Sequence, residues 1–321
     1  MPGYCDKIKH QGLLILPINI LAIIFMNNSK LPNLIIAGVH KAATTSLFTY
    51  LKSHPEVFGS GKKEVHYFTP LRYGKPLQDL QEYKKYFTDA TNETYLLEAS
   101  PSYMYGASSI INKMKEILPS HKVIIILRDP VQRFISFYCF LKAQLFLDSK
   151  ENMLSFLNKS LESYDVFTDD HYNHSIREGE YINYLPDWFD NYRQDLKIIY
   201  FEEFIAQPQS VMVELAEWLK IDPFPFKKME YTAENKTIYA QNKQLHTVAL
   251  LINNKFENFW RNNQSLKIKL RNIYYAINKN KNQKKEYDEI SLCKLKEVYE
   301  EPNKRLKLYF QQKELKLPAW L

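Results

Sequence analysis

Short runs of apolar residues recur along the chain and form its clearest pattern. Four runs cover residues 34–37, 95–97, 123–127 and 198–201, and each is rich in Ile, Val, Leu or Tyr without alternating polar positions. Strands of a parallel sheet that is covered on both faces have this composition, whereas strands with one face in water alternate. The runs therefore predict buried parallel strands.

Helical patterns separate the four runs. Residues 45–53, 107–118, 130–147 and 208–220 carry apolar side chains at the i, i+3, i+4 spacing of an amphipathic helix. This alternation of strand and helix predicts an α/β fold, a three-layer sandwich with a central parallel sheet and right-handed crossovers, as in P-loop NTPase-like proteins. Ligands of such sheets bind beyond the carboxyl ends of the strands.

The C-terminal third has a different pattern. Residues 244–276 and 288–312 have helical spacing, and a segment rich in Lys and Asn at residues 278–285 joins them as a solvated loop. The sequence contains no internal repeat and no low-complexity linker. We therefore expect one domain over residues 31–321 with helical decoration at its C-terminal end.

An apolar segment at residues 13–26 precedes this domain and follows Lys7, Lys9 and His10. It has about 14 residues against the roughly 20 that span a bilayer, and no A-x-A cleavage site follows it. Two interpretations stay open for residues 1–30. They hold either an element packed on the domain of a cytoplasmic protein or an anchor that associates with a membrane such as that of the Golgi.

The composition excludes several kinds of binding site. The chain has 321 residues and only 8 glycines, and no stretch matches the glycine-rich patterns G-x-G-x-x-G or G-x-x-x-x-G-K-[ST]. The net charge is +7, but only eight of the 43 basic residues are Arg, and no block of five like charges predicts a nucleic-acid partner. Cys5, Cys139 and Cys293 are too widely spaced for a disulfide framework or a C-x-x-C metal site.

The first candidate site follows the first apolar run. Gly38 opens a turn, and Lys41, Ala42, Ala43, Thr44, Thr45 and Ser46 lead into a helix. A helix N-terminus offers unpaired N–H groups to a phosphate, the lysine adds a charge, and the threonines supply hydroxyls and capping oxygens. The alternative is an ordinary turn with a solvent-facing lysine. Ala42 and Ala43 allow a close backbone approach only if their φ is negative, because alanine lacks the freedom of glycine, and a positive φ at either would count against the proposed loop.

The second candidate site begins where the third run ends. Asp129 and Pro130 are a helix cap and first helical residue, which places Arg128 at the tip of the strand. Arg133 and Ser136 follow one turn apart, so two arginines and a hydroxyl converge as a dianionic phosphate would require. A structural pair between Arg128 and Asp129 is the alternative.

The third candidate site is the segment at residues 61–68, which contains Glu64 and His66. In an extended chain these two side chains point to the same face. A carboxylate beside an imidazole is suited to removing a proton, although a charged surface loop would have the same composition. His171 and His174 beside Asp169 and Asp170 are interpreted as a solvated loop rather than a metal site.

Together, the three sites resemble those of sulfotransferases that use 3′-phosphoadenosine 5′-phosphosulfate (PAPS), in particular the branch that acts on carbohydrate and includes the heparan sulfate enzymes. The family patterns are G-x-x-K-[AG]-[AG]-T-T-S, K-E-x-H-[FY]-F and R-D-P-x-x-R-x-x-S-x-Y. Further similar stretches lie at residues 97–103, at 179–188 with its G-x-Y-x-x-x-L-x-x-W pattern, at 301–306 and at Trp320. The resemblance covers residues 31–321.

The resemblance implies a role for each matching residue. The segment from Lys41 to Ser46 would hold the 5′-phosphosulfate of PAPS, with Lys41 stabilising the leaving oxygen, while Arg128 and Ser136 would hold the 3′-phosphate. Glu64 would take the proton of the acceptor hydroxyl, and His66 would assist it or shape the site. The leaving group is already stable, so no metal is expected.

One departure from the pattern and two alternatives qualify this expectation. The Ser-Lys-Gly-Arg loop of the heparan sulfate enzymes is missing, and residues 234–239 are more like bacterial members, so a third phosphate contact rests on Lys236 or Lys243. A P-loop kinase shares the strand, loop and helix but would need a magnesium carboxylate that the strand ends do not offer. A non-catalytic binder of anionic glycans would not need Glu64.

Overall fold

The computed structural model describes residues 30–148, 150–164, 170–232, 242–256 and 287–321, with isolated positions between 259 and 278. Five strands form one sheet in the order β2-β3-β1-β4-β5. Every recorded strand pair is parallel, with Leu34 opposite Leu97 and Val123 opposite Leu196. The strands are β1 (Leu34–Gly38), β2 (Val57–Gly59), β3 (Tyr95–Ala99), β4 (Lys122–Leu127) and β5 (Leu196–Tyr200).

The predicted parallel strands are confirmed within two residues at each end. All five residues of β1 are buried, as its unbroken apolar composition predicted. The strand that the sequence analysis missed is β2, which has three residues and pairs only with β3 at the edge of the sheet. A run of this length is too short to produce a periodic signal.

The predicted helices are also present. They are α2 (Thr44–Lys52), α4 (Ala107–Ile117), α5 (Pro130–Ala143) and α10 (Pro208–Leu219). Helix α5 ends four residues earlier than predicted. Short helices that the pattern did not predict connect these elements: η1 (Thr69–Tyr73), α3 (Leu80–Lys84), η2 (Lys85–Phe87), η3 (Pro101–Gly106), α6 (Met153–Glu162), α7 (His171–Arg177), η4 (Tyr181–Asn183), α8 (Leu185–Tyr192), η5 (Arg193–Asp195), α9 (Phe201–Ala206) and α11 (Phe224–Lys227).

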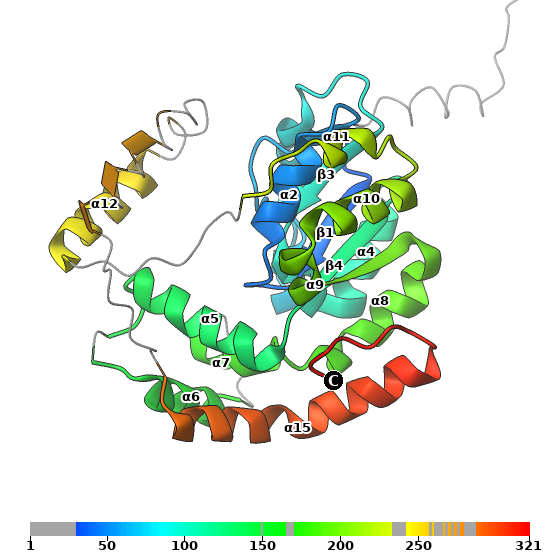
Figure 1. Cartoon of the computed structure of the whole chain (residues 1–321). Coiled ribbons are helices and arrows are strands. Elements are labelled where there is room, and N and C mark those ends of the chain that lie inside the picture. The colour runs from blue at the N-terminus through cyan, green and yellow to red at the C-terminus, as the bar shows by residue number, and fades with distance from the viewer. Residues whose placement is uncertain are drawn as a thin grey trace, which may run out of the picture.

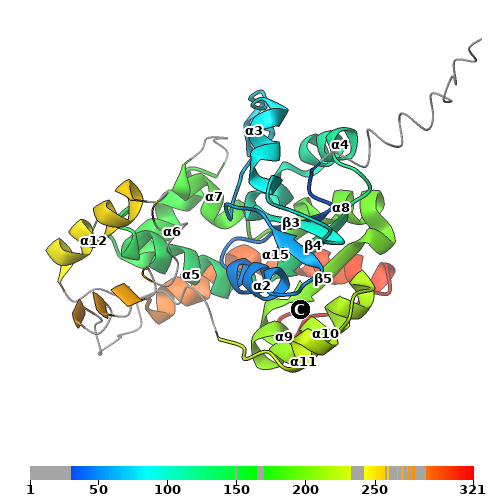
Figure 2. The ribbon, with the colours of Figure 1, turned by 90° about the horizontal axis from the view of Figure 1, so that it is seen from above.

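Helices cover both faces of the sheet, so the three-layer sandwich is confirmed. The view along the strands shows α4 and α8 on one face and α2, α9, α10 and α11 on the other (Figure 2). The central strands bury Leu34, Ile35, Val123 and Ile124 completely. Removal of so much apolar surface from water is the main contribution to the stability of this core.

The C-terminal helix builds a second core beside the sheet. Helix α15 (Glu289–Gln312) packs on α5 and α6, where Leu295 and Tyr299 join Phe134 and Phe156 in one buried cluster. Figure 1 shows α5, α6, α7 and α15 together below the sheet. The predicted helix at 288–312 is therefore confirmed, and α12 (Lys243–Lys255) lies within the predicted 244–276.

Some predictions fall on residues outside the described ranges. They are the apolar segment 13–26, most of the predicted loop at 278–285, and much of the helix predicted at 244–276. Within the ranges that are described, no helix has both the length and the apolar character needed to cross a membrane.

Candidate active site

The loop after β1 joins the strand to α2 through two residues with positive φ. Lys41 has φ 66° and Ala43 has φ 61°. The negative φ that the proposed loop requires is therefore not found at Ala43, which is the N-cap of α2 in the left-handed conformation and makes no side-chain capping bond. The chain must reverse direction between the strand and the helix, and this turn places Lys41 and Ala43 in left-handed backbone, which glycine adopts more readily.

The cap also corrects the role predicted for the threonines. Thr44 and Thr45 are the first two residues inside α2 and do not cap it. The first helical hydrogen bond runs from the N–H of Leu47 to the carbonyl of Ala43, 3.1 Å away. The first amides of a helix lie at the positive end of its dipole, as an anion site requires. The left-handed Ala43 counts against the predicted loop geometry, and anion binding at this turn stays a prediction.

Lys41 extends from this loop into a place that is largely shielded from water. Its Nζ atom lies 4.2 Å from the centre of the Phe140 ring on α5. Burial, and after it the positive charge of Arg128, lower the pKa of Lys41 to about 8. The lysine is therefore not the solvent-facing residue of an ordinary turn.

Arg128 lies against the same loop. Its guanidinium donates a hydrogen bond to the Lys41 carbonyl at 2.7 Å and stacks 4.3 Å from the centre of the Phe201 ring. Its own carbonyl accepts a 2.7 Å hydrogen bond from the Tyr181 hydroxyl. The side chain of Asp129 instead caps α5 by accepting from Val131, as predicted, so the alternative pair between Arg128 and Asp129 is not what positions the arginine.

The second arginine of the predicted pair points elsewhere. Arg133 is fully buried and donates to the carbonyl of Ser175, so the expected convergence of both arginines on one phosphate is wrong. The helical pattern could not show this because α7 and α15 cover that side of α5. Ser136 is half-buried and lies one turn before Phe140, on the face of α5 that meets Lys41.

Glu64 and His66 come together, but not because the chain is extended. Both residues have positive φ, 61° and 60°, and they still place Oε2 of Glu64 3.4 Å from Nε2 of His66. Lys63 makes the closer pair with Glu64, at 2.7 Å. Burial alone would raise the pKa of Glu64, but the hydrogen bond from His66 and the charges of Lys63 and His40 hold it well below its usual range.

A buried carboxylate fixes this segment to the sheet. Glu98 on β3 is fully buried and accepts hydrogen bonds from the hydroxyls of Tyr83, Ser100 and Tyr103. Ser100 in turn accepts a 3.0 Å hydrogen bond from the His66 amide. Burial raises the pKa of Glu98 despite these three donors. The stretch at residues 97–103 therefore positions the segment that carries Glu64.

The structure adds a cluster that the sequence analysis missed. Glu178, which is 2% exposed, accepts hydrogen bonds from Nδ1 of His40 and from the Arg72 guanidinium, both at 2.8 Å, and Arg133 lies 3.7 Å away. Burial would raise the pKa of Glu178, but the charges of His40, Arg72 and Arg133 hold it well below its usual range. The nearby His174 contacts Arg72 and Tyr73, which gives it a structural role.

The residues after Glu178 explain the G-x-Y-x-x-x-L-x-x-W stretch. A Cβ atom on Gly179 would lie 2.5 Å from the Tyr299 hydroxyl, so only glycine allows this contact with α15. Tyr181 holds the Arg128 carbonyl, and the Trp188 indole donates to the carbonyl of Met104 at 3.0 Å. In the sequence, Glu178 was marked only by its position directly before this glycine.

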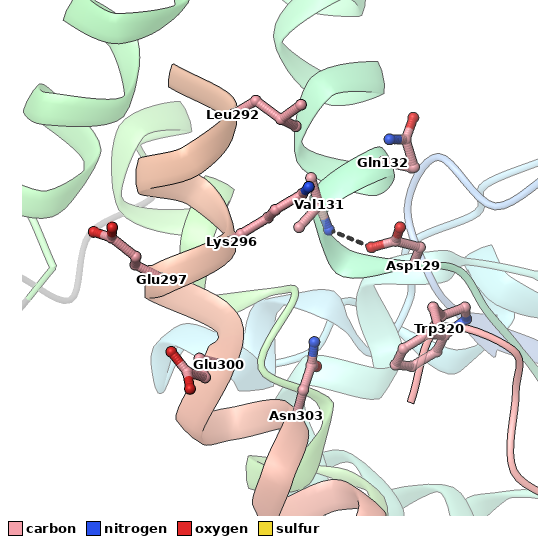
Figure 3. A pocket seen from close by; sticks show the side chains of 9 residues that line it. All are labelled: Asp129, Val131, Gln132, Leu292, Lys296, Glu297, Glu300, Asn303 and Trp320. Carbon is pink, nitrogen blue, oxygen red and sulfur yellow. Dashed lines mark hydrogen bonds between the residues drawn. The ribbon is translucent and has the colours of Figure 1, made fainter. Parts of the chain in front are cut away.

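A pocket of about 570 Å³ borders the first turn of α5 (Figure 3). One wall is α15, and the other is this turn together with Trp320. Two stretches that carried the family resemblance, residues 301–306 and Trp320, thus meet at one pocket. It is lined by Asp129, Val131, Gln132, Leu292, Lys296, Glu297, Glu300, Asn303 and Trp320.

The two residues predicted as a third phosphate contact cannot be compared with the structure. Lys236 lies outside the described residues, and so does the side chain of Lys243. The described residues contain no group of three or more His, Cys, Asp or Glu side chains that could hold a metal ion.

Comparison with known proteins identifies the family. The chain matches the sulfotransferase domain family over residues 31–301 and belongs to it. A crystal structure of a sulfotransferase from Alicyclobacillus acidocaldarius has a TM-score of 0.55 and 25% identity, and covers 64% of this chain and 85% of its own. The chain is therefore a member of the sulfotransferase family and has its P-loop-like α/β fold.

Two relatives show which kinds of sulfotransferase the chain is similar to. The bifunctional heparan sulfate N-deacetylase/N-sulfotransferase 1 of Caenorhabditis briggsae is 26% identical over 335 residues, which cover 99% of this chain and 34% of the relative. The carbohydrate sulfotransferase 15 of Rattus norvegicus is 24% identical over 62% of this chain and 45% of its own length. The chain thus spans less than half the length of either relative.

Proposed function

We propose that this sulfotransferase moves the sulfuryl group of PAPS to a hydroxyl of a carbohydrate acceptor, with an amine as the alternative acceptor group. The observation that carries the proposal is the pair of cations at the loop after β1. The Arg128 guanidinium donates to the Lys41 carbonyl, and burial, followed by the positive charge of Arg128, lowers the pKa of Lys41 to about 8. An anion bound between them would remove this repulsion.

The residues of the loop fit a phosphorylated donor. The buried Nε atom of Arg128 has no hydrogen-bond partner among the described residues, and the N-terminus of α2 turns the positive end of its dipole toward the loop. Lys41 and the segment from Ala42 to Ser46 would hold the 5′-phosphosulfate, and Arg128 with Ser136 the 3′-phosphate. When bound, PAPS would supply an activated sulfuryl group with a stable phosphate as leaving group.

Each protein group has a defined task in this scheme. The Lys41 ammonium and the helix amides stabilise negative charge on the leaving phosphate without reorganising, which is the most effective form of electrostatic catalysis. Glu64 is ionised and 37% exposed, so it can accept the hydrogen bond of an acceptor and draw off its proton. His66 holds Glu64 in position from 3.4 Å.

The names of two relatives support a carbohydrate acceptor, since one is a heparan sulfate N-deacetylase/N-sulfotransferase and the other a carbohydrate sulfotransferase. The competing proposals make different demands on the same residues. A kinase built on this loop would consume ATP with magnesium, and a non-catalytic glycan binder would not require Glu64.

The location of the protein is a separate prediction. Residues 13–26 stay a candidate membrane segment, and a cytoplasmic location stays a prediction.

A transfer assay with labelled PAPS tests the proposal. The acceptors are heparosan, its N-deacetylated form, lactose and 4-nitrophenol, which separate hydroxyl, amine and phenol transfer. We expect transfer to a glycan, its loss in Lys41→Ala and Glu64→Gln, and its retention in the surface controls Lys113→Ala and Glu116→Gln. Hydrolysis of ATP without use of PAPS would contradict the proposal.

The same variants test the role of Glu64 separately. Calorimetry with 3′-phosphoadenosine 5′-phosphate (PAP) measures affinity for the nucleotide without any turnover. Glu64→Gln should bind PAP as the wild type does, because its side chain serves the acceptor. A weaker affinity for PAP would show that Glu64 belongs to the nucleotide site, and full turnover in this variant would favour the glycan binder.

A further inference from the structure

The candidate base Glu64 is poorly suited to keeping a proton. Lys63 lies 2.7 Å from one of its oxygens and His66 lies 3.4 Å from the other. These neighbours favour the ionised form and hold the pKa of Glu64 well below its usual range. A general base is most effective when its proton affinity matches the operating pH. A second group that accepts the proton would therefore complete the site.

His40 has the position for this task. It lies between Val39 and Lys41 in the loop after β1, and its side chain is 27% exposed. The ring lies 5.5 Å from that of Tyr105, whose hydroxyl accepts a hydrogen bond from the His40 amide at 3.3 Å. The positive charge of a protonated His40 is also one of the causes that lower the pKa of Glu64, after His66 and Lys63.

The bond to Glu178 fixes the tautomer of His40. Glu178 is ionised because Arg72 and Arg133 approach it as well, so its Oε2 atom can only accept, and Nδ1 of His40 must donate. The neutral ring then carries its lone pair on Nε2, for which the described residues provide no hydrogen-bond partner. A buried carboxylate that orients an imidazole and stabilises its protonated form is a known arrangement for a general base.

We propose that Nε2 of His40 is the final acceptor of the proton in sulfate transfer, with Glu178 as its positioning residue; this inference rests on the proposed function. The acceptor oxygen forms the new bond to sulfur with a lone pair. The bond from sulfur to the bridging oxygen breaks, and its electron pair stays on the 5′-phosphate. The acceptor proton passes by way of Glu64 to Nε2, and the resulting imidazolium faces Glu178 until solvent removes the proton.

A pair of substitutions separates proton transfer from positioning. In His40→Asn the amide nitrogen can replace Nδ1 and keep the bond to Glu178, but nothing replaces Nε2. We expect kcat/KM to fall about 10²-fold in His40→Asn, with unchanged PAP affinity and thermal stability. The exposed His171→Gln is the control and should keep full activity. Wild-type turnover in His40→Asn would overturn the inference and leave the proposed function intact.

The pH profile gives a second test, measured with heparosan or lactose because their hydroxyls do not titrate. If a neutral imidazole accepts the proton, the wild type should lose kcat/KM on the acid side of its profile, and His40→Asn should lack this acid limb at whatever activity it keeps. The groups that face His40 are Glu178, Arg72 beyond it, Tyr105 and Glu64, and neither the buried, ionised Glu178 nor the arginine titrates there.

The remaining histidine near Glu64 needs its own variant. His66→Gln should keep the acid limb if His40 causes it, and should lose the limb if His66 does. An acid limb that is the same in the wild type and in His40→Asn would also overturn the inference.

The tautomer of His40 can be measured without any turnover. Nitrogen-15 NMR of labelled histidines, assigned with His40→Asn, should show the proton of the neutral ring on Nδ1, both with and without PAP. A proton on Nε2 would refute the assigned tautomer. If the wild type transfers no sulfate to any acceptor in the panel, the proposed function fails and the inference fails with it, whereas the NMR result still reports the bond to Glu178.

Discussion

Replacing Gly179 by alanine tests the link between the C-terminal helix and the active site. A Cβ atom there would lie 2.5 Å from the Tyr299 hydroxyl oxygen and 2.7 Å from two of its ring carbons. Tyr299 is fully buried, and its hydroxyl donates to the carbonyl of Ile176 at 3.1 Å. Overpacking costs about 1–3 kcal/mol and loss of this buried hydrogen bond about 1–3 kcal/mol more, so the free energy of unfolding should drop by about 2–6 kcal/mol.

Two other glycines supply matched controls for urea denaturation. At Gly61 an added Cβ would meet only the Tyr86 carbonyl at 3.7 Å, so Gly61→Ala should be nearly neutral. Gly74 has φ +65° in open space, so Gly74→Ala isolates backbone strain and should cost about 1 kcal/mol. If Gly179→Ala costs no more than Gly74→Ala, the packing of Tyr299 against Gly179 is not as described.

Two further predictions concern the loop after β1. The pKa of Lys41 is about 8 and catalysis needs its charge, so kcat/KM should fall about tenfold per pH unit above pH 8. Lys41→Arg has a permanent charge and should lack this alkaline limb at whatever activity it keeps. A wild-type profile without the alkaline limb would contradict the role assigned to Lys41. Ala43→Gly should raise the free energy of unfolding by about 0.5–1 kcal/mol, since φ 61° suits glycine. Ala42→Gly, at a residue without positive φ, should lower it.

Much of the architecture could be predicted because local signals suffice for it. Unbroken apolar runs identify buried parallel strands, and the Asp-Pro pair at 129–130 fixes the start of α5. The loop of Lys41 and the segment of Glu64 were found because short motifs carry them. Edge strand β2 was missed because its three residues take their structure from pairing with β3.

The errors concern side chains whose direction depends on packing. Helical spacing placed Arg133 with Ser136, but two helices cover that side of α5 and bury the arginine. An extended chain was expected at Glu64, whereas the side chains meet through two left-handed residues. Glu178 lies far from His40 in sequence, so no local pattern could reveal their bond.

The dependence of this bond on α15 has a consequence for synthesis. The loop that carries His40 is among the first parts of the domain to be made, whereas Tyr299, which packs against the residue after Glu178, is among the last. A chain still lacking α15 also lacks the contact of Tyr299 with Gly179, the residue next to the carboxylate that accepts from His40. Translation adds about 5–20 residues per second, so the loop of His40 is synthesised well before the helix that packs behind its partner.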